Sequence, residues 1–322
     1  MLPLGKVPIR ILDGLVLSKL SPGEEVVVKP SVGLDFSAIR VGDEYLIVSS
    51  DPVTGAYRRV GWYAVNVGCN DVSTSGSRPR YVENVILLPE GAGEPLLEEL
   101  VGDMVKAAES LGVSIVGGHT EVTKGLDRPI VIVTAMTFAK EFVTASGCRP
   151  GDRIFMTKSA GLEGTSILSE LVEGSPAEGF EESLSVVEEA VASFSTGLVH
   201  AMHDPTEGGI LGGVYEMSLA SNLGFTLYED RVPVAEKTSE LCSTLGIDPL
   251  KLISSGSLLI SVGREDEKEF EREMEAHGFD VSCIGEFTEG PRVLKRRDGR
   301  AEVVGEVVDE LWRVLSSPKL KY

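Results

Sequence analysis

Residues 93–122 read GEPLLEELVGDMVKAAESLGVSIVGGHTEV, and within them a helix pattern changes to a strand pattern. Apolar residues recur at spacings of three and four over 94–111, which predicts an amphipathic helix. One glycine later, the run VSIV at 113–116, which is rich in β-branched residues, predicts a strand. A helix with a single apolar face must cover another element, so this stretch indicates a layer of helices on a sheet.

The same alternation continues on both sides of this stretch and predicts an α/β (α+β) protein. In the first half we expect further strands at 44–50, 81–88 and 130–138, and a further helix at 61–74. In the second half we expect strands at 153–157, 198–202, 225–228 and 257–262, a hairpin turn at 297–299, a helix after Asp204, and helices at 165–172, 181–194, 265–277 and 306–315. The turn-rich run SGCRPGD at 146–152 separates the halves, so we predict an N-terminal domain at 1–147 and a C-terminal domain at 148–322.

The composition is that of an acidic globular protein. Its 322 residues include 30 Lys and Arg against 50 Asp and Glu, which gives a formal net charge of −20. This charge repels nucleic acids and anionic lipid surfaces, so we expect no nucleic-acid partner and no membrane partner. No apolar run is long enough to span a membrane and the first residues do not have the pattern of a signal peptide, so we expect a cytoplasmic protein. The four cysteines are widely spaced, and we expect reduced thiols.

Several acidic residues stand at strand ends and turns, beside Gly, Asn, Ser or Pro. They are Asp35, Asp51, Asp71, Glu121 and Asp204. A buried carboxylate needs a partner, and Mg²⁺ favours carboxylates together with water and phosphate oxygens, so several of these residues converging would suit a metal and nucleotide site. The common phosphate-loop, dinucleotide, zinc-protease and serine-hydrolase motifs are absent. The alternative for each residue taken alone is a helix cap or a turn.

Glycine pairs and a lysine are the candidates for phosphate contacts. Gly117-Gly118 follows a predicted strand, Gly208-Gly209 opens a predicted helix, and Lys158 ends a predicted strand. Backbone amides at glycine turns and helix N-termini bind phosphate oxygens, although such turns are also common without a ligand and a strand-end lysine is often simply exposed. His119, between the first glycine pair and Glu121, is a candidate general base or ligand.

Two further histidines, His200 and His203, stand three residues apart at a predicted strand end. This spacing does not place both rings on one face of a strand. A zinc site that uses both histidines is therefore disfavoured.

Six segments, in order along nearly the whole chain, carry a resemblance to a known family. They are Gly5-Lys6-Val7-Pro8, 33–39, 49–55, Asn70-Asp71 with 75–79, 117–122 and 204–209. Together they resemble the superfamily of aminoimidazole ribonucleotide synthetase (PurM), which also contains thiamine-monophosphate kinase, selenophosphate synthetase and the hydrogenase-maturation protein HypE. The HypE-like branch is the most similar.

The resemblance implies a PurM-like two-domain fold, in which the N-terminal sheet pairs with that of a second subunit and a nucleotide cleft lies between the domains. It implies a homodimer that uses ATP and Mg²⁺ for in-line phosphoryl transfer to, or oxygen activation on, a small-molecule acceptor. We therefore expect Asp35, Asp51 and Asp71 to hold the metal and His119 and Asp204 to act in catalysis. Nucleotide contacts are expected from Asp35, Asp51, Asn70, Asp71, Gly117, Gly118, Glu121, Lys158 and Thr206.

The sequence departs from the HypE pattern at its end. HypE ends in a flexible tail whose terminal cysteine carries the carbamoyl group to be dehydrated, whereas this sequence ends SPKLKY and its last cysteine is Cys283. We therefore expect no protein-bound thiocyanate on this chain. Our main expectation is ATP-dependent chemistry on an unidentified small acceptor. The alternatives are a non-catalytic nucleotide-binding or scaffold homologue, and hydrogenase maturation that uses the cysteine of a partner protein.

Overall fold

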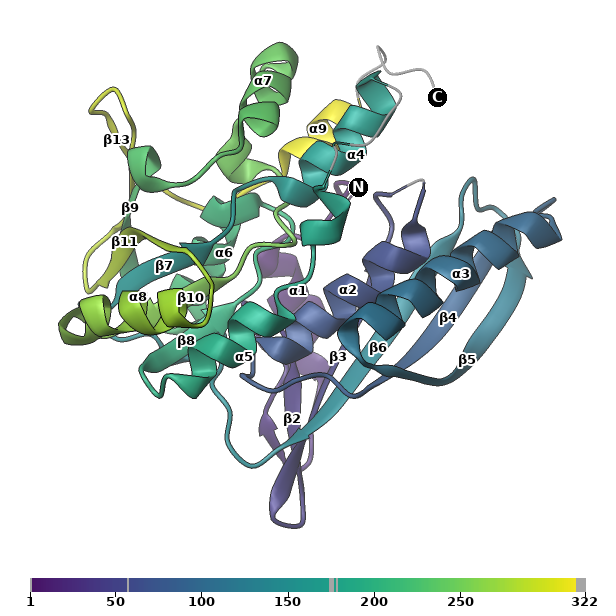
Figure 1. The fold of residues 1–322 in the computed structure, drawn as a ribbon, viewed down its shortest axis with the longest axis horizontal. Coiled ribbons are helices and arrows are strands. Elements are labelled where there is room, and N and C mark those ends of the chain that lie inside the picture. Colours follow the sequence, from purple (N-terminus) through teal and green to yellow (C-terminus); the bar gives the residue numbers. More distant parts are fainter. Residues whose placement is uncertain (1, 57, 174–176, 178, 317–322) are drawn as a thin grey trace.

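Two β-sheets and the helices that cover them make up the fold (Figure 1). The computed structural model describes residues 2–56, 58–173, 177 and 179–316. The first sheet has six strands in the order β1-β2-β3-β6-β4-β5. These strands are β1 (Val26–Val28), β2 (Ser37–Val41), β3 (Glu44–Val53), β4 (Tyr81–Pro89), β5 (Ser114–Thr123) and β6 (Ile130–Ala139). Strands β4 and β5 are parallel, and the other neighbouring strands are antiparallel.

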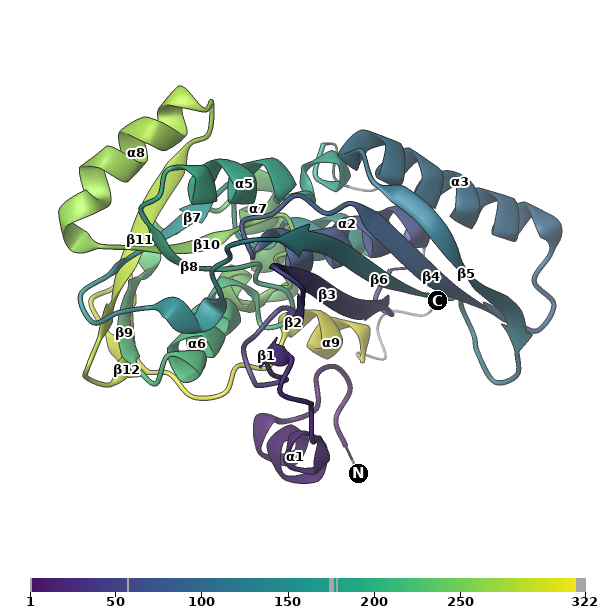
Figure 2. The ribbon, with the colours of Figure 1, turned by 90° about the horizontal axis from the view of Figure 1, so that it is seen from below.

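Helices α2 (Val60–Ser73) and α3 (Glu94–Leu111) cover one face of the first sheet (Figure 2). The two helices pack closely because Gly61 has no side chain: a Cβ there would lie 2.3 Å from the carbonyl oxygen of Leu100. Along β6, buried residues under α2 alternate with half-exposed ones on the other side, as the two-residue period of a strand requires.

Strand register sorts the side chains of the first sheet between its two faces. Asp51 stands opposite the buried Val133, so it points toward the helices. The remaining residues of these strands point to the other, half-exposed side of the sheet, where they also stand opposite one another. We call this side the open face. The open face includes Val48, Val85, Ile132, Thr134 and Met136.

The second sheet has seven strands in the order β13-β12-β9-β11-β7-β10-β8. They are β7 (Arg153–Thr157), β8 (Val199–His203), β9 (Gly224–Tyr228), β10 (Leu259–Val262), β11 (Val281–Thr288), β12 (Arg292–Lys295) and β13 (Ala301–Val303). The helices of this half are α4 (Leu162–Glu173), α5 (Val187–Ser195), α6 (Gly209–Ala220), α7 (Glu236–Leu245), α8 (Glu267–Ala276) and α9 (Glu310–Leu315). Helices cover both faces: Phe155 of β7 packs on Phe270 of α8, while its neighbour Ile154 belongs to the core that contains Ile210 of α6.

The chain begins with α1 (Ile9–Leu15), which contributes no buried residue. Short 3-10 turns lie at Leu17–Lys19, Ala145–Gly147, Glu181–Ser183, Glu229–Arg231, Pro249–Lys251 and Arg264–Asp266. Within the described residues, none of the helices has the length and apolar character that crossing a membrane requires.

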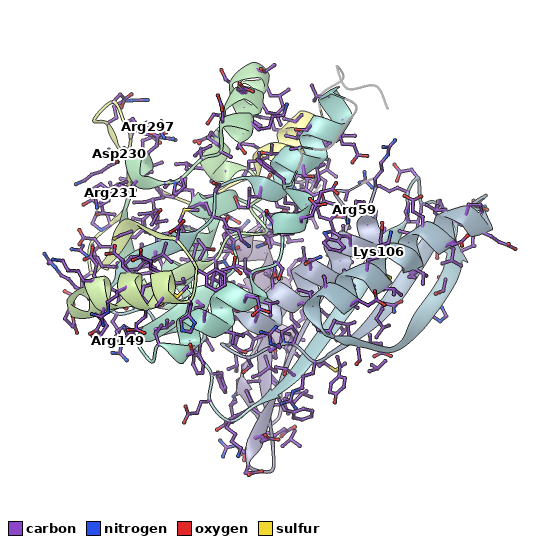
Figure 3. The ribbon with its side chains drawn as sticks, viewed as in Figure 1. Arg59, Lys106, Arg149, Asp230, Arg231 and Arg297 are labelled. Carbon is purple, nitrogen blue, oxygen red and sulfur yellow. The ribbon has the colours of Figure 1, made fainter. Side chains whose placement is uncertain are left out.

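Ion pairs join the two halves of the chain. Arg59, at the start of α2, forms an ion pair with Glu181 and lies over the ring of Trp62, 4.6 Å from its centre (Figure 3). Farther along, both terminal nitrogens of Arg78 bond to Glu188, one of them at 2.6 Å. The first contact fastens the start of α2 to the 3-10 turn at Glu181–Ser183, and the second fastens the segment between α2 and β4 to α5.

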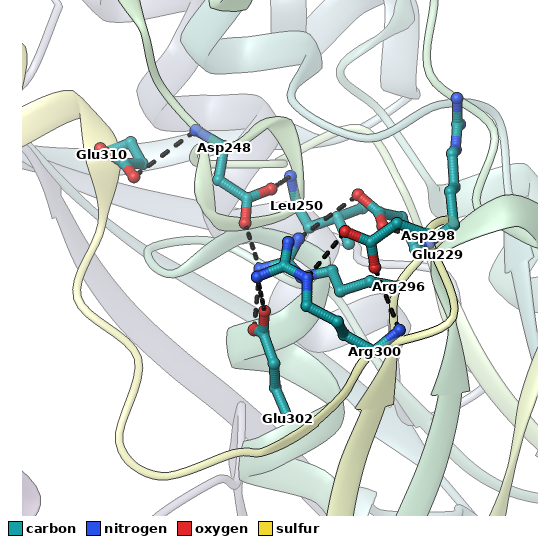
Figure 4. A network of polar contacts seen from close by, with 9 residues as sticks. Glu229, Asp248, Leu250, Arg296, Asp298, Arg300, Glu302 and Glu310 are labelled. Carbon is teal, nitrogen blue, oxygen red and sulfur yellow. Dashed lines mark hydrogen bonds and ion pairs between the residues drawn. The ribbon is translucent and has the colours of Figure 1, made fainter.

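A single arginine organises the hairpin of β12 and β13. Arg296 lies 2.9 Å from Asp248 and 3.1 Å from Glu302, and it also pairs with Glu229 at 3.3 Å (Figure 4). Each of the three carboxylates can accept a charge-assisted hydrogen bond from this guanidinium. The negative charge of these three acidic residues is therefore partly offset locally.

The structure confirms the α/β fold class and corrects several element limits. The strand expected at 113–116 continues to Thr123, and the single helix expected at 181–194 is a 3-10 turn followed by α5. Strands β1 and β2 and helix α7 were not expected from the sequence pattern. The domain boundary at 147/148 falls between β6 and β7 and stays a prediction.

Candidate functional site

Four aspartates from distant parts of the chain lie close together, and we call them the aspartate cluster. Asp51 lies in β3 and Asp71 in α2, while Asp35 precedes β2 and Asp204 follows β8. The charges of the other three all act on Asp71, which is 4% exposed. The fold thus brings together the three residues predicted for the metal and one of the two predicted for catalysis.

The aspartate cluster has carboxylate oxygens without hydrogen-bond partners. Within the described part of the chain, both oxygens of Asp204 and Oδ2 of Asp35 are buried and unpartnered. Burial raises the pKa of Asp71 and of Asp204 well above the usual range, and the neighbouring carboxylates add to this rise. Buried carboxylates without hydrogen-bond partners lower the stability of the fold, and a divalent cation would supply the missing partner. The donor set therefore fits Mg²⁺ accompanied by phosphate oxygens.

His203 lies beside the aspartate cluster with a carboxylate at each ring nitrogen. Its Nδ1 is 2.5 Å from Asp35 Oδ1, and its Nε2 is 3.2 Å from Glu216 Oε2. Lys6 Nζ lies 3.1 Å from Glu216, and the backbone amide of Lys6 donates to Glu207 at 2.7 Å. Burial would lower the pKa of His203, but Asp35 and Glu216 raise it to about 10. The segment around Lys6, which precedes α1, is thereby bound to this site.

The predicted phosphate turn at Gly208-Gly209 does open a helix, α6. Both glycines have positive φ, +88° and +62°, and a Cβ on Gly209 would lie 2.6 Å from the carbonyl oxygen of Leu252. The amide of Gly208 donates to Asp309 at 2.6 Å, so the protein itself uses it. Thr206 lies in the same turn, where its carbonyl oxygen accepts from Gly209 at 3.0 Å. The start of α6 lies five residues after Asp204, a member of the aspartate cluster.

Asn70 holds a loop and does not face the aspartate cluster. Its Nδ2 donates to the carbonyl oxygen of Leu184 at 2.8 Å, and its Oδ1 accepts from the amide of Val186 at 2.9 Å. The residue has no exposed surface. The predicted nucleotide contact is therefore corrected to a link between α2 and the segment before α5, since both ends of the amide are engaged there.

Asn70→Ala is expected to lower the free energy of unfolding by about 2–4 kcal/mol, because it leaves one buried carbonyl and one buried amide unpaired. Chemical denaturation measures the change. Asn66→Ala is the matched control, since Asn66 is also buried in α2 but donates to the carbonyl of Trp62 within the same helix. A loss for Asn70→Ala no larger than that of the control would contradict the role.

Lys158 also serves the loop before α5. Its Nζ lies 2.7 Å from Glu189, donates to the carbonyl oxygen of Ser183 at 3.0 Å and donates to that of Ser185. Three acceptors occupy the three donors of the ammonium group. The structure therefore places Lys158 as an internal clamp, which corrects its expected contact with phosphate.

The glycine pair of the 117–121 motif lies within a strand and is not a turn. β5 continues through Gly117 and Gly118, which stand opposite Glu83 and Asn84 of β4. A Cβ on Gly118 would lie 2.2 Å from the carbonyl oxygen of Asn84, so the glycine serves close approach of the strands. The two glycines therefore lie in an edge strand and not in the turn that was expected to cradle phosphate.

His119 and Glu121 lie on the open face of the first sheet. His119 stands opposite Val85, whereas Asp51 points to the helices on the other face, and two strands separate β5 from β3. His119 Nε2 is 3.0 Å from Glu121. A hydrogen bond from Thr123, and to a smaller extent one with His119, lowers the pKa of the Glu121 carboxyl group. Within one chain these two residues do not join the aspartate cluster, contrary to expectation.

A second group of buried acids, which sequence reasoning missed, lies beside the start of α6. Glu163 is 5% exposed, its Oε2 is unpartnered among the described residues, and burial raises its pKa to about 7. Burial also raises the pKa of Asp309 to about 7, although the amides of Gly208 and Leu311 donate to it. The available signal was a single acidic residue within the small and apolar run AGLEGTSIL at 160–168.

The four cysteines are unpaired and poorly accessible. Cys69, Cys148 and Cys242 are buried and Cys283 is half-buried. Burial raises the pKa of every one of these thiols, to about 12 for Cys148 and Cys242. A thiolate is the reactive form, so none of them is a ready nucleophile near neutral pH.

Two family models match most of the chain. The model described as AIR synthase related protein, N-terminal domain, matches residues 33–139, and the corresponding C-terminal domain model matches residues 149–295.

Relatives with names cover the same two halves. A protein of Methanocaldococcus jannaschii, provisionally named a hydrogenase expression/formation protein, is 26% identical over 96% of this chain and 97% of its own length. The carbamoyl dehydratase HypE of Azotobacter vinelandii is 33% identical over 70% of this chain and 69% of its own length.

Solved structures agree in fold. A chain in the crystal structure of a HypE–HypF complex aligns with a TM-score of 0.78 at 23% identity, over 92% of this chain and 99% of that one. A crystal structure of HypE in complex with ATP aligns with a TM-score of 0.73 at 26% identity, over 95% of this chain and 93% of that one. On these matches, the chain belongs to the AIR synthase-related (PurM) superfamily, in its HypE-like branch.

Proposed function

We propose that this chain binds Mg-ATP at the aspartate cluster and uses it to dehydrate a carbamoyl group in hydrogenase maturation. The observation that carries the proposal is the set of buried, unpartnered oxygens of Asp35 and Asp204 beside Asp71. The 33% identical relative is named a carbamoyl dehydratase, and the 26% identical HypE structure holds ATP. These likenesses favour a carbamoyl acceptor over the unidentified small molecule of the broader expectation.

Dehydration of a carbamoyl group requires its oxygen to become a leaving group. Transfer of the terminal phosphoryl group of ATP to that oxygen forms a C–O–P bond and releases ADP. Loss of phosphate, together with the two N–H protons, then leaves a nitrile carbon on the carrier atom. In this scheme the aspartate cluster would hold the cation that neutralises phosphate charge.

The thiol that carries the carbamoyl group would come from another molecule. All four cysteines of this sequence are buried or half-buried with raised pKa values, so none fits a carrier that must enter and leave a site. A partner protein is consistent with the likeness to a chain in the structure of a HypE–HypF complex. Residues 317–322, where the sequence lacks the terminal cysteine of HypE, lie outside the described residues.

We infer that two copies pair through the open face of the first sheet. This face is half-exposed and largely apolar, and residues 117–122 along the edge strand β5 are all exposed. Pairing would bury the face and would bring His119 and Glu121 to a second copy.

Ile132→Glu is expected to convert the dimer to a monomer, because it places a charge at the centre of the open face. Light scattering coupled to size exclusion measures the mass. Val101→Glu on α3, which is 41% exposed on the helical side, is the control and should leave the dimer intact. A monomeric parent protein would refute the inference.

The proposed function is tested by calorimetry followed by turnover. Titration of ATP with and without Mg²⁺ should show saturable binding that depends on the cation. An S-carbamoyl cysteine peptide, added with Mg-ATP, should then lose one water by mass spectrometry while ADP forms. Binding without turnover would favour the non-catalytic alternative, and absence of binding would remove the nucleotide site altogether.

A further inference from the structure

We propose that Asp35, His203 and Asp204 form a site for a divalent transition metal of the Mn²⁺ type, which overlaps the Mg²⁺ site of the proposed function at Asp35 and Asp204 and lies beside the oxygen-only pair of Asp51 and Asp71. One ligand atom from each of the three residues lies within 4.8 Å of the other two. Asp204 is 1% exposed and His203 is 3% exposed. This inference adds to the proposed function, with which it shares Asp35 and Asp204, and it can fail while that function stands.

The unpartnered oxygens point to a ligand at this position. Neither oxygen of Asp204 has a hydrogen-bond partner among the described residues, and the same holds for Oδ2 of Asp35. One carboxylate oxygen of each aspartate lies within 4.8 Å of the other and of an imidazole nitrogen of His203. Hydrogen-bond donors from the protein do not fill this need, so a cation is the group that the geometry fits.

The surroundings of His203 are those of a metal-ligating imidazole. Such a histidine usually donates its second ring N–H to a carboxylate, which fixes the ring and its tautomer. Nε2 of His203 lies within ion-pair distance of Glu216, at 3.2 Å, without the geometry of a hydrogen bond, and Glu216 is itself held by Lys6 at 3.1 Å. Nδ1 is thereby directed to the side of Asp35 and Asp204, where a cation could replace its contact with Asp35.

The donor set decides the class of metal. One imidazole nitrogen with carboxylate oxygens favours borderline cations such as Mn²⁺, Fe²⁺ or Zn²⁺, whereas Mg²⁺ prefers oxygen ligands and retained water. Asp51 and Asp71 offer oxygen alone and suit Mg²⁺. The two kinds of site would therefore stand side by side, with the transition metal joining Asp35 of the first half to the end of β8 in the second.

The test uses Mn²⁺ alone on the full-length, chelator-treated protein without nucleotide. Pulsed electron paramagnetic resonance should detect ¹⁴N modulation from an imidazole bound to Mn²⁺. Protein grown with ¹⁵N-labelled histidine should shift that modulation, which assigns it to histidine without any mutation. Mn²⁺ bound with no histidine coupling, or no Mn²⁺ bound, would overturn the proposal.

His203→Gln is expected to abolish the nitrogen modulation and to weaken Mn²⁺ binding by about tenfold or more. The matched control is His200→Gln on the same strand, because His200 lies 2.9 Å from Asp152 and is not one of the three ligands. The control should keep the nitrogen signal. Mg-ATP calorimetry on both variants then reports separately on the proposed function, and persistence of the signal in His203→Gln would refute the assignment.

Discussion

Asp71→Asn is expected to weaken Mg²⁺-dependent ATP binding by about a hundredfold while raising the thermal stability of the nucleotide-free protein. The two effects have one cause. Asp71 is buried against three other carboxylates, so placing a negative charge there destabilises the nucleotide-free fold. Asparagine keeps an oxygen that can accept the 2.6 Å bond from Ser49 and removes the charge.

Calorimetry with and without Mg²⁺ measures the affinity, and thermal denaturation without nucleotide measures the stability. Asp13→Asn on the exposed side of α1 is the control and should change neither quantity. A variant that binds Mg-ATP as tightly as the parent would remove Asp71 from the site. A variant that is less stable than the parent would show that hydrogen bonding at Asp71 outweighs charge repulsion.

The aspartates could be predicted from the sequence because each one follows an apolar run near a strand or helix. Asp51 and Asp204 stand at or just beyond the ends of apolar runs, and Asp71 follows a run of small and apolar residues. Physical chemistry makes such positions poor places for a charge without a partner. The sequence alone does not reveal which of these residues lie close together, because that depends on the order in which the strands pair.

The 117–121 motif shows the limit most clearly. Two consecutive glycines normally indicate a turn, but here the parallel pairing with β4 extends the strand through both. Pairing register also decides that His119 points away from Asp51, and a shift of one residue would have reversed it. Lys6 and Glu216 were missed for a related reason: 210 residues separate them, so no local pattern links them.

Glu163→Gln is expected to raise the free energy of unfolding near pH 8 by about 3 kcal/mol and to have almost no effect near pH 4.5. Burial raises the pKa of Glu163 from 4.5 to about 7, so the folded state binds this proton more tightly than the unfolded state does. Stability therefore falls as the pH rises from the unfolded pKa through the folded one. Glutamine stays neutral throughout and escapes that loss.

Chemical denaturation of parent and variant across this pH range measures the difference. Glu98→Gln on the exposed side of α3 is the control and should leave the pH profile unchanged.

Asp309→Asn should behave differently from Glu163→Gln, although both acids have a pKa of about 7. Asp309 accepts hydrogen bonds from the amides of Gly208 and Leu311, and asparagine offers only one of the two acceptor oxygens. If Glu163→Gln were no more stable than the parent near pH 8, the unpartnered Oε2 of Glu163 would have to find a partner that the described residues do not supply. The most direct such partner would be a bound cation or ligand at the start of α6, which would extend the acidic site from the aspartate cluster toward Asp309.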